Sequence, residues 1–221
     1  QKIIKKTESS KYMNILGEEE KAHLIMKLRG QGLRSYEVLT AIEKIPRDFF
    51  VEKALRNHAW ENVPLPIGEG QTISQPYIVA FMTDKLNLNR RNVVLEVGTG
   101  SGYQAAILSQ LCRRVYSIER IKSLHIIANH RFQKLGLSNI STRLGDGSKG
   151  WSEASPFDNI IITCACKNVP KTLLEQLKIS GKLITPEISD DQKQYLYLYT
   201  KIEKGKFEKK CLEEVRFVPM I

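Results

Sequence analysis

The sequence predicts an α/β protein with a doubly wound, mainly parallel sheet, a helical cap before the sheet and an antiparallel hairpin after it. From residue 77 onward, strand-like apolar runs alternate with helical patterns, an order typical of parallel sheets with crossover helices. The run at 93–97 is apolar enough for a strand buried on both faces, and closely spaced glycines follow it. The alternating stretch Q-Y-L-Y-L-Y-T indicates the hairpin.

The first part of the chain predicts helices without recognisable chemistry. Residues 1–16 are rich in lysine and serine, and we expect a flexible tail there. Three consecutive glutamates then open a helical pattern that Gly30 ends. Ser35 suits the N-cap of a second helix, which ends before Pro46. A turn and a third short helix are expected to complete a cap at 17–60.

Residues 61–76 interrupt this regular pattern. The segment carries three prolines, two glycines and the hydroxyls of Thr72 and Ser74. Long irregular segments in a compact chain are often functional, because a connector can be much shorter. We therefore expect an active-site loop, with a plain connector as the alternative. Pro76 can open the next helix, at the start of a ligand-binding core that extends to residue 221.

The core is expected to contain five strands in parallel, followed by the hairpin. The expected strands lie at 93–97, 114–119, 139–144, 159–163 and 181–186, and the hairpin turns at 204–206. Helices are expected after Pro76, from Tyr103, between Glu119 and Gly136, and at 171–178. The length suits one α/β domain with an appendage, so residues 17–221 are predicted to form a single domain.

The turn after the first core strand indicates a nucleotide-type ligand. Gly98, Gly100 and Gly102 lie between a strand and a helix, where bare backbone and the first helical amides can approach a ligand. The next strand ends at Glu119, and 119 − 98 = 21 residues suits a carboxylate that binds a ribose diol. Asp146 follows the third strand and can meet an adenine amine. A glycine turn that only packs a helix on a strand is the alternative.

Composition narrows the function further. Of the 221 residues, 42% are hydrophobic and 26% charged, with no apolar run near the ~20 residues of a membrane span. The net charge is 34 − 24 = +10, but acids interleave with the basic residues, so we expect no nucleic-acid partner. The four cysteines form no disulfide framework, and the first residues lack the apolar core of a secretory signal. We expect a cytoplasmic monomer without a metal or a membrane partner.

Several segments carry a family resemblance. The E-x-G-x-G-x-G string from Glu96 resembles motif I of the class I S-adenosylmethionine-dependent methyltransferases, which have a Rossmann-like fold. The strings P-R-D-F-F-V at 46–51, G-E-G-Q-T-I-S-Q-P-Y-I-V-A-F-M at 68–82 and V-R-F-V-P at 215–219 are more specific. Over about residues 20–221, the chain resembles the protein-L-isoaspartate O-methyltransferases. T-I-S-Q-P is the most specific part, since methyltransferases in general do not share it.

The resemblance implies methyl transfer from S-adenosylmethionine to the free α-carboxylate of L-isoaspartyl residues in damaged proteins, with S-adenosylhomocysteine as product. The ester then closes to a succinimide, and hydrolysis returns part of it to aspartyl. Ser74 is implied at the catalytic centre, with Thr72, Ile73 and Gln75 in the substrate-binding loop. The implied cofactor-binding residues are Glu96, Gly98, Thr99, Gly100, Ser101, Gly102, Glu119, Asp146 and Gly147.

This chemistry agrees with the lack of an evident catalytic acid–base pair. A carboxylate has a pKa of about 4, so it is a nucleophile at neutral pH without a general base. The enzyme then has to align the reactants and exclude water. Ser74 is expected to orient the acceptor carboxylate by a hydrogen bond.

Alternative functions stay open at this point. The acceptor can be a small-molecule carboxylate or a nucleic acid, or the protein can bind cofactor without turnover. T-C-A-C-K-N-V-P at 163–170 lacks the [N/D]-P-P-[Y/F] pattern of base-methylating enzymes. Cys164 and Cys166 replace small residues of the family, and their spacing is poor for zinc. An acidic stretch after Pro186 replaces the short glycine-containing turn that is usual in the family. Because that turn helps to frame the peptide substrate in the family, the affinity of this chain for isoaspartyl peptides is in question.

Overall fold

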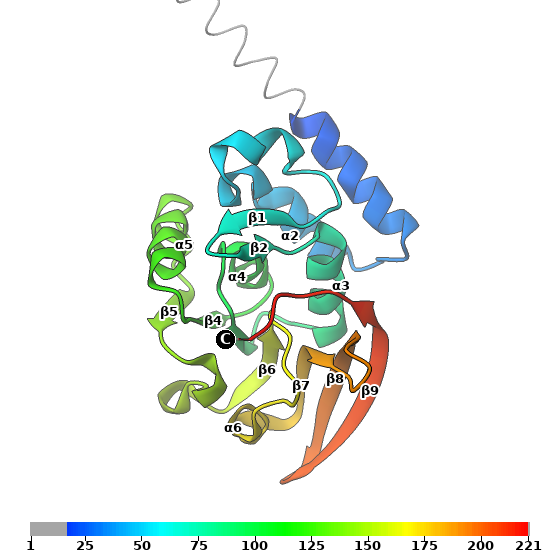
Figure 1. Cartoon of the computed structure of the whole chain (residues 1–221), viewed down its shortest axis with the longest axis vertical. Helices are drawn as coiled ribbons and strands as arrows, with labels where there is room; N and C mark the ends of the chain where they lie inside the picture. Colours follow the sequence, from blue (N-terminus) through cyan, green and yellow to red (C-terminus); the bar gives the residue numbers. More distant parts are fainter. Residues whose placement is uncertain (1–16, 221) are drawn as a thin grey trace, which may run out of the picture.

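The computed structural model describes residues 17–220, so the predicted tail at 1–16 and Ile221 lie outside the described part. The described residues contain a seven-stranded sheet in the order β5-β4-β3-β6-β7-β8-β9 (Figure 1). Its strands are β3 (Val93–Val97), β4 (Arg114–Glu119), β5 (Ile140–Leu144), β6 (Phe157–Ile162), β7 (Leu177–Ile188), β8 (Gln194–Glu203) and β9 (Lys206–Val215). Strands β3 to β7 are parallel, whereas β8 and β9 pair antiparallel. The predicted fold class and the hairpin are confirmed.

Helices cover both faces of the sheet and enclose two apolar cores. On one face lie the cap and three helices, α3 (Pro76–Leu86), α4 (Tyr103–Ser109) and α5 (Lys122–Lys134). On the other face lie α6 (Lys171–Glu175) and the residues around the short turns η3 (Gly147–Lys149) and η4 (Ser152–Ala154). Because successive side chains of a strand point to opposite faces, every residue of the central strand β3 is buried.

The central strand β3 marks the point where the winding of the sheet reverses. It pairs with β4 on one side and with β6 on the other, and Val97 lies opposite both Ile118 and Ile162. Ligands of doubly wound sheets bind outside the carboxyl ends of the strands at this point. The glycine-rich turn follows β3 there, as the sequence predicts.

The cap begins with two helices where the sequence predicts them. One includes residues 17–30, and α2 (Tyr36–Lys44) has Ser35 as its N-cap, with the Ser35 hydroxyl accepting from the Val38 amide. The predicted third helix is instead two 3₁₀ helices, η1 (Arg47–Phe50) and η2 (Lys53–His58). A 3₁₀ helix has three residues per turn, so Arg47 and Phe50 share one side and are both fully buried.

The predicted irregular segment at 61–76 contains a small antiparallel hairpin. Its strands are β1 (Leu65–Gly68) and β2 (Gln71–Ile73). The hairpin lies between the cap and the sheet (Figure 1). Prolines on both sides of Leu65 mask its strand pattern, because proline lacks the amide of a regular ladder. Pro76 then opens α3, in agreement with the prediction.

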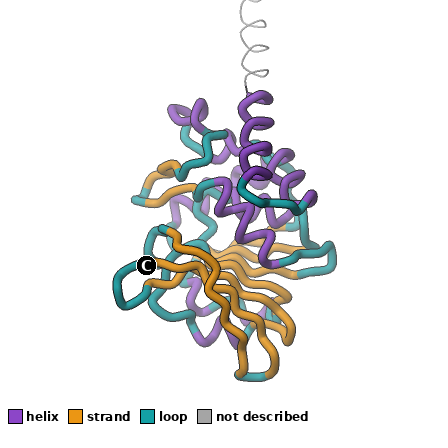
Figure 2. The backbone as a smooth tube through the Cα atoms, turned by 90° about the vertical axis from the view of Figure 1, so that its right-hand side faces the viewer, coloured by secondary structure: helices purple, strands orange, loops and turns teal. Residues whose placement is uncertain are grey.

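The last third differs from the prediction in its boundaries. α6 ends at Glu175, before residue 178, and β7 begins at Leu177, before residue 181. The register of β6 and β7 shifts at this point, so β7 contains an irregularity that hides its start in the sequence. The hairpin β8–β9 extends away from the cap (Figure 2). After β9 the chain returns to the loop that follows β6, where Pro219 bridges Ala165.

Candidate active site

The glycine-rich turn is shaped by close packing against neighbouring strands. Gly98 has φ +96°, and a Cβ there would clash with Thr163 Oγ1 after β6. The Gly98 amide donates to Ile118 O on β4 at 2.9 Å. A Cβ on Gly147 would clash with Val97 at the end of β3. Glycine at these two positions therefore lets three strand ends converge on one pocket.

Glu119 lies at the end of β4 with its carboxylate fixed by the backbone. One oxygen accepts from the Gly100 amide at 2.7 Å, and the other accepts from the Ile121 amide at 2.8 Å. The residue is 6% exposed and lines the pocket beside the turn. A carboxylate held in this way keeps lone pairs free for the hydroxyls of a ligand.

Glu96 is directed away from this pocket. Its side chain is fully buried beneath the turn, where one oxygen accepts a hydrogen bond from Ser117 Oγ. Ser117 Oγ also bonds Thr99 Oγ1 at 2.5 Å, which continues the chain to the glycine-rich turn. Burial raises the pKa of Glu96 to about 8, so the carboxyl is mostly protonated at neutral pH.

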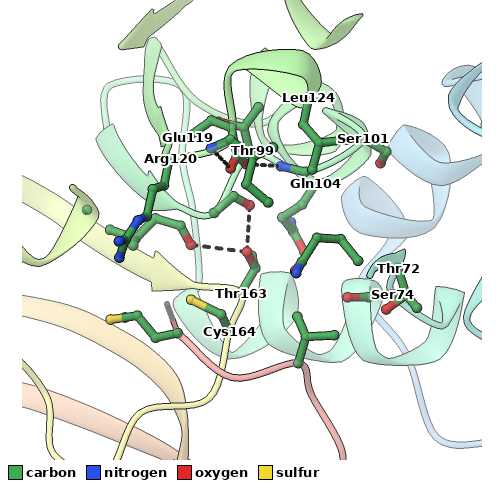
Figure 3. Close-up of a pocket in the computed structure, with 18 of the residues that line it drawn as sticks. Thr72, Ser74, Thr99, Ser101, Gln104, Glu119, Arg120, Leu124, Thr163 and Cys164 are labelled. Carbon is green, nitrogen blue, oxygen red and sulfur yellow. Dashed lines mark hydrogen bonds between the residues drawn. The ribbon is translucent and has the colours of Figure 1, made fainter. Parts of the chain in front are cut away.

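The hairpin and the start of α3 form the opposite wall of the pocket. Thr72, Ile73 and Ser74 line this wall (Figure 3). The side chain of Gln75 does not line the pocket; its amide donates to Asn62 O at 2.8 Å. Asn62 Oδ1 in turn accepts from the Tyr77 amide at 2.9 Å. Asn62 therefore holds the chain after Ser74 at two residues, Gln75 and Tyr77.

Asp146 and Gly147 lie at the end of β5, also along the pocket. Asp146 Oδ1 accepts from the amide and the hydroxyl of Ser148, at 3.0 and 2.7 Å. These hydrogen bonds lower the pKa of Asp146. Its carboxylate is therefore charged at neutral pH and can accept a further hydrogen bond.

Most of the predicted site residues thus converge on one pocket. Those that line it are Thr72, Ile73, Ser74, Gly98, Thr99, Gly100, Ser101, Glu119, Asp146 and Gly147. Glu96 supports the turn from behind, and Gly102 packs against Phe132 on α5. Gln75 lines the adjoining groove instead of this pocket.

Other parts of the chain, beyond the site residues that the resemblance implies, complete the pocket. Gln104 and Arg120 lie on the cofactor side, Thr163 and Cys164 follow β6 (Figure 3), and residues 218–220 close one edge. Thr163 Oγ1 donates to Gly98 O at 2.6 Å. Burial raises the pKa of Cys164 to about 12, so its thiol is neutral. No signal within the local sequence marks these residues, because only the sheet order brings them together.

A second groove meets this pocket at Ser74. Pro64, Ile78 and Phe217 give it apolar walls, with Glu214 and Arg216 as its charged groups. Four residues line both cavities: Thr72, Ser74, Thr163 and Val218. Within residues 17–220, no group of three His, Cys, Asp or Glu side chains is placed to hold a metal ion.

Residues 19–221 match the family model of the protein-L-isoaspartate(D-aspartate) O-methyltransferases. The chain belongs to this family. A protein-L-isoaspartate O-methyltransferase of Parvibaculum lavamentivorans is 48% identical over 206 residues, which are 93% of each chain. A solved protein-L-isoaspartate O-methyltransferase is 30% identical with a TM-score of 0.84, over 90% of this chain and 65% of that one.

A more distant structure supports the fold alone. It is a Plasmodium falciparum protein in complex with S-adenosyl-L-homocysteine, 24% identical, with a TM-score of 0.81 over 91% of this chain and 98% of that one. This protein-L-isoaspartate O-methyltransferase family member contains, among its described residues, no helix long and apolar enough to cross a membrane.

Proposed function

We propose that the protein transfers a methyl group from S-adenosylmethionine to the α-carboxylate of L-isoaspartyl residues in damaged proteins. The observation that carries this proposal is the junction of two cavities at Ser74. One cavity contains the glycine-rich turn and Glu119, and the other is a groove with apolar walls and two charged residues, which suits a peptide. A methyl donor and a peptide acceptor bound on the two sides meet at this hydroxyl.

The pocket residues fit S-adenosylmethionine. The turn exposes backbone where side chains would block a ligand, and the Glu119 carboxylate faces the pocket as an acceptor for ribose hydroxyls. Asp146 can accept from the adenine amine, and Ile118, Ile121 and Leu124 line the same pocket as apolar groups. When bound, the cofactor supplies a methyl group on a positively charged sulfur. A related protein was solved with S-adenosyl-L-homocysteine, the product that such a transfer leaves.

The protein then has to align the acceptor and keep water out. An isoaspartyl α-carboxylate is ionised at neutral pH, so no side chain has to remove a proton. Ser74 donates a hydrogen bond that orients the carboxylate toward the pocket. The Thr163 hydroxyl also lies at the junction, but its proton is donated to Gly98 O. Thr163 can therefore only accept a hydrogen bond from a ligand, whereas Ser74 can donate one. The hairpin on one side and residues 218–220 on the other restrict solvent access.

The experiment uses labelled S-adenosylmethionine and two peptides that differ only in an isoaspartyl or an aspartyl linkage. We expect base-labile label on the isoaspartyl peptide and none on its partner. Label on both peptides would indicate a general carboxyl methyltransferase. Cofactor binding without transfer to either peptide would refute the proposed acceptor and leave the family and fold unchanged.

The proposal includes a cytoplasmic, monomeric enzyme whose cap, loop and core act as one unit. All four cysteines are free thiols, which suits a reducing compartment. The altered stretch after Pro186 lies between β7 and β8, and residues 189–193 of this stretch line neither cavity. Its effect on substrate affinity is therefore expected to be small.

A further inference from the structure

Arg47 is buried in the cap without an acidic partner. Its side chain is fully buried, and no described residue forms a salt bridge with it. Burial lowers the pKa of Arg47 to about 10, so the guanidinium remains charged at neutral pH. A buried cation without a counter-ion is costly, and a fold that contains one needs a compensating structural role.

The guanidinium holds the chain that leads to the active-site hairpin. Nε donates to Ala59 O at 2.7 Å, and Nη2 donates to Val63 O at 3.2 Å. Val63 lies two residues before the hairpin, and Ser74 directly follows it. Between the two carbonyls lies Asn62, whose own carbonyl accepts from the Gln75 side chain. Residues 59–63 therefore form a strap that Arg47 holds at Ala59 and Val63. Gln75 joins this strap, through Asn62, to the residues that follow Ser74.

The same guanidinium also contacts the helix that follows the glycine-rich turn. It lies 5.1 Å from the ring centroid of Tyr103, the first residue of α4. Phe50 packs edge-on against this ring at 5.5 Å, and Arg131 lies over Phe50 at 5.8 Å. Arg131 then donates to Ser101 O within the turn at 2.9 Å. Two arginines and two aromatic rings thus connect the strap with the turn.

We infer that Arg47 is a positioning residue, which sets the location of the Ser74 hydroxyl relative to the glycine-rich turn through the strap at 59–63. The inference rests on the proposed function, because it concerns the distance between the methyl donor and the acceptor. A planar fork with several donors can hold two carbonyls and stack on a ring at once, which a lysine cannot do.

The test compares Arg47→Met with Arg131→Met. Arg47 lies against Tyr103 and Arg131 lies against Phe50, at opposite ends of the same aromatic pair. Each variant therefore replaces an arginine with an uncharged methionine at one end of this pair. Arg47→Met is expected to lower kcat with an isoaspartyl peptide about 10- to 100-fold, since misalignment slows the transfer step. Its dissociation constant for S-adenosylhomocysteine, measured by titration calorimetry, should stay within about twofold. Arg131→Met should instead weaken S-adenosylhomocysteine binding, and Arg47→Lys should restore part of kcat.

Two further measurements make the outcome decisive. Gln75→Met removes the hydrogen bond that joins the strap to the residues after Ser74, at a half-buried site, so it tests the inference even if Arg47→Met does not fold. Because Gln75 also lines the second groove, its effect on kcat is interpreted together with hydrogen exchange. Hydrogen exchange of residues 59–77 should be faster in both variants than in the wild type. Wild-type kcat in both, or equal losses of kcat and cofactor affinity, would overturn the inference. A wild type that binds S-adenosylhomocysteine but methylates no isoaspartyl peptide would refute the proposed function, while faster exchange in Arg47→Met would still support the strap.

Discussion

Ser74 and Glu96 show two opposite uses of a polar side chain in one site. Ser74 lies at the junction of two cavities, where its hydroxyl can reach a ligand. Glu96 lies fully buried beneath the turn, where its carboxyl bonds Ser117 and through it Thr99. In the proposed function, Ser74 acts on the acceptor, and Glu96 supports the backbone that receives the donor.

Replacing Ser74 with alanine is expected to slow turnover without loss of cofactor binding. A hydrogen bond to a charged group contributes about 1.5–3 kcal/mol, so kcat should fall about 10- to 100-fold. The measurement is kcat with an isoaspartyl peptide beside the S-adenosylhomocysteine dissociation constant. Ser152→Ala, at an exposed serine that lines neither cavity, is the control and should retain wild-type kcat. Unchanged turnover in Ser74→Ala would contradict the assigned role.

Glu96 predicts a pH dependence of stability. Its pKa is raised from 4.5 in the unfolded chain to about 8 in the folded protein, so the folded state alone is protonated between these values. The stability contributed by this proton is present at low pH and is lost as the pH rises toward 8. Glu96→Gln keeps an acceptor for Ser117 and cannot ionise.

From pH 6 to pH 8, the wild type should therefore lose about 2 kcal/mol of its free energy of unfolding relative to Glu96→Gln. Urea unfolding at both pH values provides the comparison. Glu203→Gln, at an exposed glutamate, should follow the wild type. Parallel pH profiles for Glu96→Gln and the wild type would show that Glu96 is ionised in the folded state.

Single residues were predictable from sequence where local chemistry marks them. Gly98 belongs to the E-x-G-x-G-x-G motif and Ser74 to the T-I-S-Q-P motif, and the structure brings both to one pocket. The sequence could not predict that the Glu96 side chain points away from the pocket. Both faces of β3 are buried, so an alternation of polar and apolar residues does not distinguish them. Thr163 and Val218 line the junction only because distant segments meet, so no local pattern identifies them.

At the scale of elements, the hairpin β1–β2 is the part that the sequence describes least well. Its tip, Glu69, has φ +55° between two glycines, and its carboxylate accepts from the Ser123 hydroxyl on α5 at 2.6 Å. Ile67 on the same hairpin lies beside Gly100 of the turn. The hairpin thus spans the pocket from the cap to α5. Proline and glycine content predicts irregular chain here, whereas these contacts between elements define a strand pair.

The contact between Glu69 and Ser123 is expected to slow release of the cofactor product. Glu69→Ala and Ser123→Ala remove the same hydrogen bond, so each should raise the S-adenosylhomocysteine dissociation rate about two- to fivefold. Stopped-flow measurement gives these rates. The double variant should match either single variant, because both substitutions remove one shared interaction. Additive effects, or unchanged rates, would show that the hairpin tip does not restrain the ligand.

At the scale of the whole molecule, the mainly parallel sheet with its terminal hairpin was the most predictable property. Alternating strands and helices with right-handed crossovers leave few arrangements, and the five parallel strands follow the expected one. The length of β7 and the two 3₁₀ helices of the cap were not predictable, because they depend on a register shift and on the packing of Arg47 and Phe50. The net charge of +10 carries no information about the fold.

Residues 218–220 close the pocket although all seven strands precede them in the chain. A chain that lacks only these last residues still contains all seven strands but not the whole pocket lining. Cofactor binding stabilises only states that can bind it, so S-adenosylmethionine offers little protection to a shortened or still-growing polypeptide. Such a shortened chain would thus have its sheet without stabilisation by the ligand.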